Sequence, residues 1–123
     1  MNISNADLRH CPDALLEGDD GSSSDYVGVA NEFADESVDF VLIDGIHRGA
    51  VAMHVTPKVR RGGLVVIDNV NWYLPSNSRS PASRTLDDGP AEANWETFSR
   101  MTKDWRRIWT SSDVWDTLIL FKP

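Results

Sequence analysis

Carboxylates follow apolar runs at three places in this chain. "LLEG" leads into Asp19, "FVLI" leads into Asp44, and "LVVI" leads into Asp68. If these runs are parallel strands, their carboxyl ends share one edge of a sheet, which is where ligands bind in open α/β folds. The three carboxylates could therefore converge on one ligand, although an aspartate at a strand end can also cap the turn or helix that follows.

A histidine lies close to the second of these carboxylates. His47 is three residues beyond Asp44, and an imidazole titrates near neutral pH. His47 could therefore act as a general base that deprotonates an acceptor hydroxyl. The alternative is a residue of the first helical turn that bonds a carboxylate.

The elements that must position these residues alternate between strand and helix. This order predicts one α/β domain over residues 1–123, with a mostly parallel sheet, helices on both faces and a C-terminal antiparallel hairpin. The expected elements are a strand at 14–18, a helix capped by Ser23 or Ser24, a strand at 38–44, a helix from 47 to 61 striped by Val51, Val55 and Val59, a strand at 64–70, an irregular loop at 71–90, a helix at 91–105, and two strands joined by a Ser-Ser-Asp turn.

Composition narrows the class of protein. The chain has 123 residues, 41% of them hydrophobic, and a formal net charge of −7. An acidic protein lacks the basic surface that nucleic acid or anionic membrane requires, so neither is expected as a partner. Cys11 is the single cysteine, which rules out an internal disulfide. The polar start shows no secretory signal and no apolar run reaches the ~20 residues of a membrane span, so we expect a soluble cytoplasmic protein.

Four segments together resemble a known family. "EGDD", "SVDFVLIDGIHRGAV", "VRRGGLVVIDNVNW" and "WDTLILFK" are similar to the later motifs of class I S-adenosylmethionine-dependent methyltransferases, and most similar to the small-molecule branch whose fourth strand ends in Ile-Asp-Gly-x-His. The resemblance covers residue 14 to the end. It implies a partial Rossmann-like methyltransferase fold that corresponds to the last five of seven strands.

The first two strands of that fold, and the Gly-rich turn that holds the methionine part of the cofactor, have no counterpart in the sequence. The chain thus resembles the C-terminal half of such an enzyme, whether from a truncated gene or a cut protein. We therefore expect weak or absent S-adenosylmethionine binding, and no activity for this chain alone.

The resemblance also implies roles for individual residues. Asp19 would face the adenine amino group, with the Asp20 amide nearby. Asp44 would lie beside the sulfonium or the acceptor and share the catalytic site with His47. The reaction would be O- or N-methylation of a small-molecule acceptor.

A metal site is a further implication of the resemblance. Asp44, Asp68 and Asn69 match the positions that hold the ion in cation-dependent O-methyltransferases, and their oxygens suit Mg²⁺. The alternative is a metal-free relative with an aspartate after the fifth strand.

The loop at 71–90 leaves the sheet at the expected ligand edge. Loops of that length inside a small domain are usually functional. We interpret it as a lid over the acceptor, with Trp72, Tyr73, Arg79 and Arg84 as substrate-binding residues.

Two other functions fit the same residues. The chain could be a non-enzymatic remnant or interaction domain, or a metal-dependent hydrolase that uses Asp44, His47 and Asp68. If the chain is a methyltransferase fragment or a non-enzymatic remnant, the first strand of the resembled fold is missing. The strand at 38–44 then lacks the strand that it pairs with in that fold. The strand at 14–18 could move into the vacant place, or two chains could pair along the exposed edge or exchange segments. We expect the second outcome, a homodimer.

Overall fold

The computed structural model describes residues 5–11 and 20–123. The strand predicted at 14–18 and the site residue Asp19 lie outside the described residues. The remaining predicted elements can be compared with the structure directly.

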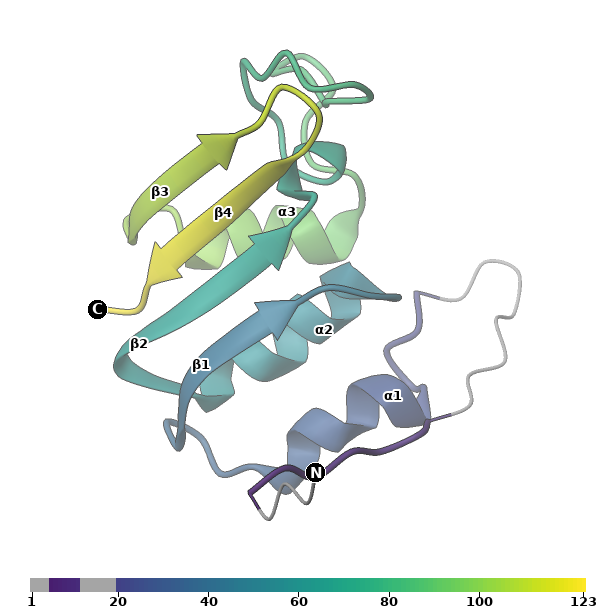
Figure 1. Cartoon of the computed structure of the whole chain (residues 1–123), viewed down its shortest axis with the longest axis vertical. Helices are drawn as coiled ribbons and strands as arrows, with labels where there is room; N and C mark the ends of the chain where they lie inside the picture. The colour runs from purple at the N-terminus through teal and green to yellow at the C-terminus, as the bar shows by residue number, and fades with distance from the viewer. Residues whose placement is uncertain (1–4, 12–19) are drawn as a thin grey trace.

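A mixed sheet of four strands forms the centre of the molecule (Figure 1). Strands β1 and β2 are parallel, whereas β4 is antiparallel to both β2 and β3. The hairpin prediction is confirmed, but a mostly parallel sheet is wrong for the described strands, because the pair of β1 with β2 is parallel while the pairs of β4 with β2 and with β3 are antiparallel. The strands are β1 (Val38–Ile43), β2 (Val59–Asp68), β3 (Arg106–Ser111) and β4 (Asp116–Phe121), in the spatial order β1-β2-β4-β3.

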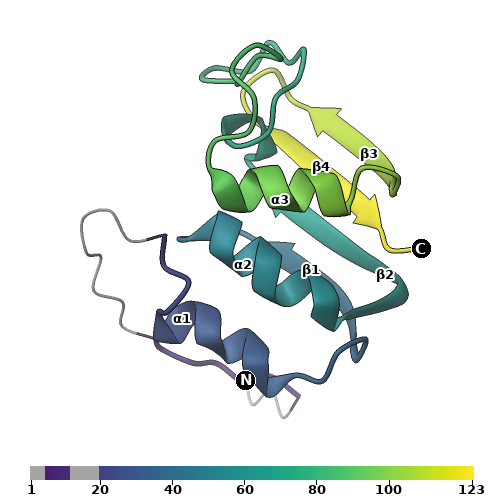
Figure 2. The same ribbon diagram turned by 180° about the vertical axis from the view of Figure 1, so that it is seen from behind.

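The helices lie on one side of this sheet, as the two opposite views show (Figures 1 and 2). The prediction of helices on both faces is therefore wrong for the described residues. The helical segments are α1 (Asp25–Gly28), η1 (Val29–Glu32), α2 (Arg48–Val55), η2 (Thr56–Lys58), η3 (Val70–Trp72) and α3 (Ala93–Met101).

Local sequence explains where α1 begins and where α2 ends. The Ser24 hydroxyl accepts a hydrogen bond from the Val27 amide at 3.2 Å, the N-cap expected from the serine run. Helix α2 was predicted to continue to residue 61, but it ends at Val55. Pro57 has no N–H to donate to a further helical turn, so the chain passes through η2 and becomes extended at Val59.

The hydrophobic core lies between the sheet and helices α2 and α3. Alternate side chains of the strands point toward it, as the period of two in a strand requires. Trp95 and Phe98 of α3 are fully buried there and meet edge to face, with ring centroids 5.6 Å apart. Their main partners from the sheet are Ile43, Val65, Ile67, Leu118 and Leu120.

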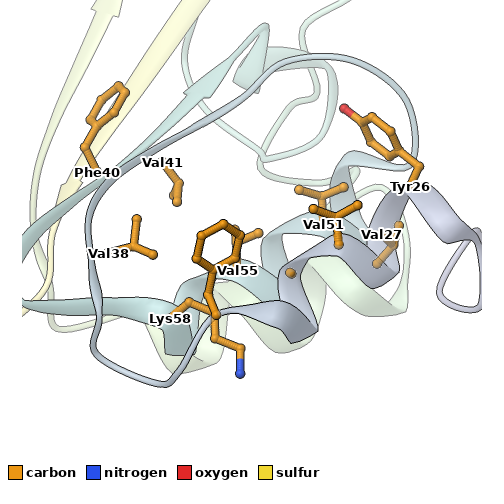
Figure 3. Close-up of a pocket in the computed structure, with 11 residues that line it drawn as sticks. Tyr26, Val27, Val38, Phe40, Val41, Val51, Val55 and Lys58 are labelled. Atoms are coloured by element: carbon orange, nitrogen blue, oxygen red, sulfur yellow. The ribbon is translucent and has the colours of Figure 1, made fainter. Parts of the chain in front are cut away.

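A hollow of about 320 Å³ lies between α1–η1 and the outer edge of β1. Figure 3 shows Val38, Phe40 and Val41 on one side of it and Tyr26 and Val27 on the other. The lining is almost wholly apolar. Within residues 5–11 and 20–123, no helix combines the length and apolar composition needed to cross a membrane.

Candidate functional site

The chain turns sharply after both parallel strands. His47 (φ 49°) follows β1 and Asn69 (φ 51°) follows β2, and both adopt the left-handed conformation at the start of a helical segment. This conformation is costly for a residue with a Cβ atom and is enriched at functional sites. The two equivalent turns bring the residues after β1 and β2 to one edge of the sheet.

Arg48 joins these two turns. Its Nε donates to the Gly45 carbonyl at 2.9 Å, and Nη1 donates to the Asp68 carbonyl at 2.6 Å and to Asn69 Oδ1 at 3.2 Å. Its Nη2 donates to Asp44 Oδ1 at 3.1 Å. The side chain is 10% exposed, so one guanidinium fixes the geometry of both strand ends.

Arg48 contacts the side chains of two predicted metal ligands, Asp44 and Asn69. The guanidinium contacts the side-chain oxygens of both Asp44 and Asn69, while the Asp68 carboxylate accepts a bond from Thr117 Oγ1 at 3.5 Å. A divalent cation on the same oxygens would meet a fixed positive charge, so this arrangement does not fit Mg²⁺. Within the described part of the chain, no group of three or more His, Cys, Asp and Glu side chains could hold a metal ion, which also leaves Asp44, His47 and Asp68 without a shared ion.

A cavity of about 350 Å³ opens beside the turn after β1. We call it the strand-end cavity. Its walls come from four segments that are far apart in the sequence. The lining residues are Asp20, Gly45, Ile46, His47, Arg48, Gly49, Tyr73, Ala91, Glu92 and Trp95.

His47 is held in this wall by a glycine from another segment. A Cβ atom on Gly21 would fall 2.1 Å from His47 Cγ and 2.2 Å from Nδ1, so the Gly21 backbone lies directly against the imidazole. Gly21 also has a φ of +77°, which strongly favours glycine. A side chain at residue 21 would therefore displace His47 and strain the backbone.

Asp20 stands beside the histidine as an anion. Its Oδ1 accepts from the Ser22 amide at 2.9 Å, and its Oδ2 accepts from Asn94 Nδ2 at 3.0 Å. These hydrogen bonds, the Ser22 amide first, hold the pKa of Asp20 below its ordinary value, and the nearby His47 acts in the same direction. Asp20 therefore carries a full negative charge at neutral pH.

Glu92 brings a second carboxylate to the same wall. Burial raises the pKa of Glu92 above its ordinary value, and the charge of Asp20 raises it further. The carboxylate reaches helix α2, because a Cβ atom on Gly49 would lie 2.0 Å from Glu92 Oε1. The Arg48 charge in the same lining is paired with Asp44, so the two carboxylates of Asp20 and Glu92 leave the cavity suited to a cationic ligand.

Stacked aromatic rings form the apolar wall of the cavity. Tyr73 and Trp95 stack with centroids 5.1 Å apart and an interplanar angle of 23°. The Arg48 guanidinium lies 5.6 Å from the Tyr73 centroid, which adds a cation–π contact. A ligand in the cavity would thus meet carboxylates on one side and aromatic surface on the other.

The structure places the other sequence-predicted residues outside this lining. Asp44 pairs with Arg48 and is exposed, and Trp72 and Arg79 are also exposed. Arg84 donates to the carbonyls of Gly89 at 2.7 Å and Asp88 at 3.1 Å. It therefore braces its own loop, and of the four predicted acceptor residues the cavity includes Tyr73.

The buried carboxylate of Asp116 connects the loop at 71–90 to the sheet. Asp116 is buried at the start of β4, where it accepts from Ser80 Oγ at 2.6 Å and from the Trp109 indole at 2.7 Å. Its amide donates to Asn71 Oδ1 at 3.1 Å. Burial raises the pKa of Asp116, but the serine hydroxyls and the indole together lower it more, so the pKa lies below its ordinary value. We call Asn71, Ser80, Trp109 and Asp116 the Asp116 cluster.

The same cluster limits how the loop could act as a lid. Asn71 Nδ2 donates to Ser83 Oγ at 3.0 Å, and the Arg84 amide donates to the Asn71 carbonyl at 2.9 Å. The Ala91 amide closes the base of the loop on the Tyr73 carbonyl at 2.8 Å. The base therefore forms part of the cavity wall, while Asn71 and Ser80 tie the loop to the β3–β4 hairpin.

Four residues of the site were missed by sequence reasoning. They are Gly21, Arg48, Glu92 and Asn94. Arg48, directly after His47, was the one with a local signal, since an arginine at the turn after a strand can bond the freed carbonyls. Glu92 and Asn94 reach the site through the packing of α3 against α2, and Gly21 reaches it through the contact of its own segment with His47. No local pattern reports either contact.

In comparisons with known proteins, no family model, no curated protein and no solved structure matches this chain.

Proposed function

We propose that the strand-end cavity binds a cofactor of the S-adenosylmethionine type, within a methyltransferase-like protein that acts on a small-molecule acceptor. The observation that carries the proposal is the meeting of Asp20, His47 and Glu92 around one cavity at the carboxyl end of β1. Two carboxylates and an imidazole, beside stacked aromatic rings, suit a ligand with a cationic centre and flat apolar parts.

The topology supports the same proposal. The strand order β1-β2-β4-β3 ends in an antiparallel hairpin, which is the ending that the resemblance implies. Asp20 and His47 lie on the cavity at the positions that match the family motifs. Asp44 matches a motif as well, but in the structure it pairs with Arg48 instead of facing the cavity.

Each residue of the cavity would have a separate chemical role. When bound, the cofactor would supply an electrophilic methyl group on its sulfonium sulfur. Asp20 and Glu92 would balance the positive charge, and Tyr73 would shield one side from water. His47 would accept the proton that an acceptor hydroxyl or amine loses as its oxygen or nitrogen is methylated.

Binding is expected to be weak. The sequence has no Gly-rich turn of the kind that holds the methionine part in the resembled family, so a large share of the contacts is not supplied by these residues. We expect a Kd of about 1 mM, which corresponds to roughly −4 kcal/mol. A micromolar Kd would overturn this expectation and show that the cavity is sufficient by itself.

An affinity comparison tests the proposed function. S-adenosylmethionine is cationic at sulfur and S-adenosylhomocysteine is not, so Asp20→Asn should weaken the first about fivefold, for a charge contribution of ~1 kcal/mol, and the second much less. The matched control is Asp25→Asn, which removes an exposed charge of α1 outside the cavity. Equal effects of the two substitutions, or no binding of either compound at millimolar concentration, would contradict the proposal.

A further inference from the structure

The hollow beside β1 has the size of a small-molecule site. Its volume of about 320 Å³ lies within the range of ligand pockets, roughly 300–1,000 Å³. Three parts of the fold enclose it, namely α1–η1, the outer edge of β1 and one side of α2. Its described lining shares no residue with that of the strand-end cavity, so a ligand in the hollow is independent of the proposed function.

The walls of the hollow favour an alkyl group over water. Val41 of β1 lines it together with Val51 and Val55 of α2 (Figure 3). A buried water needs about two to four polar partners. The Tyr26 hydroxyl does not supply them, because it lies against Gly45, where a Cβ atom would fall 2.8 Å from it. An apolar group is therefore the better occupant of this space.

Two aromatic rings of the hollow remain in contact with water. Phe33 is 48% exposed and Phe40 is 50% exposed, and both belong to the lining. A ligand chain in the hollow would cover apolar surface of both rings. Removal of apolar surface from water is favourable in proportion to its area, so the two rings add to the affinity for an apolar chain.

A positive charge stands at one end of the hollow. Lys58 lines the hollow with its alkyl chain, and Figure 3 shows its nitrogen at the rim. The Lys58 Nζ donates to Asp35 Oδ1 at 2.7 Å. This hydrogen bond and the charge of Lys58 hold the pKa of Asp35 below its ordinary value, and the charge of Lys122 acts in the same direction. Two lysines therefore act on one exposed aspartate.

The other acids close to this end in the sequence have cationic partners of their own. Glu36 Oε1 lies 3.8 Å from Arg61 Nε, and Asp39 Oδ1 accepts from Arg60 Nε at 2.5 Å. Among the described residues at this end, cationic side chains therefore outnumber carboxylate side chains. An anionic group on a ligand would restore the balance, which is the charge complementarity of a binding site.

We propose that the hollow beside β1 binds a small amphipathic anion, a single alkyl chain that ends in a carboxylate. The chain would lie between Val41, Val51 and Val55 and cover the rings of the lining. The carboxylate would meet the Lys58 ammonium at the rim and stay in contact with water. Ion pairs at a surface contribute little. The chain therefore supplies most of the affinity, and the lysine selects acids over neutral compounds.

Titration of the full chain with octanoate tests the proposal. The methyl signals of Val41, Val51 and Val55 should shift in NMR spectra along one binding curve. From hexanoate through heptanoate to octanoate, each added methylene should lower the Kd about fourfold, the factor that corresponds to one buried CH₂ group. No shift of these methyl signals through the millimolar range, or a Kd that does not depend on chain length, would overturn the proposal.

Vesicles distinguish a free acid from a membrane lipid with the same chemistry. Vesicles of phosphatidylglycerol should not retain the protein in sedimentation, because the hollow is proposed to take one chain. Retention of the protein on these vesicles would assign the ligand to a membrane and overturn the proposal.

Substitutions at the rim test the charge. Lys58→Met keeps an apolar side chain and should weaken octanoate about fivefold, while the Kd of 1-octanol stays the same. Asp35→Asn should tighten octanoate about twofold, because it removes the anion that competes for Lys58. Lys103→Met is the matched control, since Lys103 is an exposed lysine outside the described lining. Equal effects of the two lysine substitutions on octanoate, or an equal loss for 1-octanol in Lys58→Met, would overturn the proposal.

Discussion

Two carboxylate clusters lie at the same end of the sheet, and they differ in what surrounds them. Asp116 is buried, and hydroxyl and indole donors occupy its oxygens. Asp20 and Glu92 face a cavity, and the charge of Asp20 raises the pKa of Glu92. The Asp116 carboxylate is fully buried and is closed to a ligand, whereas the Asp20 carboxylate, although it accepts from Ser22 and Asn94, is exposed and can still be reached by a ligand.

Loss of the Asp116 charge should give the largest effect. Asp116→Asn replaces an acceptor of charge-assisted bonds with a group that also presents N–H donors toward Ser80 and Trp109. We expect it to lower the free energy of unfolding by about 3 kcal/mol. Equilibrium denaturation by urea measures this, and a change within ~0.5 kcal/mol would contradict a fastening role.

The same substitution has a pH signature. Because the pKa of Asp116 is lowered in the folded state, its contribution to stability is present above the ordinary carboxyl pKa and is lost as pH falls through the lower folded value. The parent should therefore lose stability below about pH 4, and Asp116→Asn should lose less over that range. Parallel pH profiles for the two proteins would contradict this assignment.

Gly21→Ala should have the next largest effect, and it concerns the cavity. The added Cβ atom would overlap the His47 ring, and the φ of +77° is strained for alanine. We expect a loss of about 2 kcal/mol in unfolding free energy, together with changed chemical shifts of the His47 ring protons in NMR spectra. Gly28→Ala is the control, because a Cβ atom there meets nothing within 4 Å, and it should be neutral or slightly stabilising.

Glu92→Gln should have the smallest effect, with the opposite sign. A raised carboxyl pKa means that the group stabilises the fold fully below its ordinary pKa, and that this is lost as pH rises through the raised value. Glu92→Gln should therefore stabilise the protein at neutral pH and not near pH 3. Solvent screening of this partly exposed side chain limits the gain to less than ~1 kcal/mol. Thermal denaturation at both pH values measures the difference, and destabilisation at neutral pH would contradict it.

The sequence predicted the local parts of this molecule well. The strand β1, the Ser24 cap, the irregular loop and the final hairpin follow from period, capping and turn residues. The strand predicted at 64–70 is present as β2, but it begins earlier, at Val59, and ends at Asp68. The end of α2 was wrong because a valine stripe was given more weight than Pro57. The missing N–H of a proline ends the helix, because side-chain packing cannot replace the lost backbone hydrogen bond.

The site was predicted less completely, for a physical reason. No local pattern indicated that Arg48 would contact both Asp44 and Asn69, or that Glu92 would reach Gly49. Those contacts depend on how α2 lies between β1 and α3. Residues adjacent to a strand end could be identified from the chain, but residues brought there by tertiary packing could not.

The amide chemical-shift map of the protein titrated with S-adenosylhomocysteine tests the central claim most directly. If the strand-end cavity is the ligand site, the amides of Asp20, residues 45–49 and residues 91–95 should shift together with one binding curve. The amide chemical shifts of Ser80, Trp109 and Asp116 should not change, because the hydrogen-bond partners of these residues are internal. No shifts at millimolar ligand, or the largest shifts in the Asp116 cluster or in the hollow beside β1, would contradict the account.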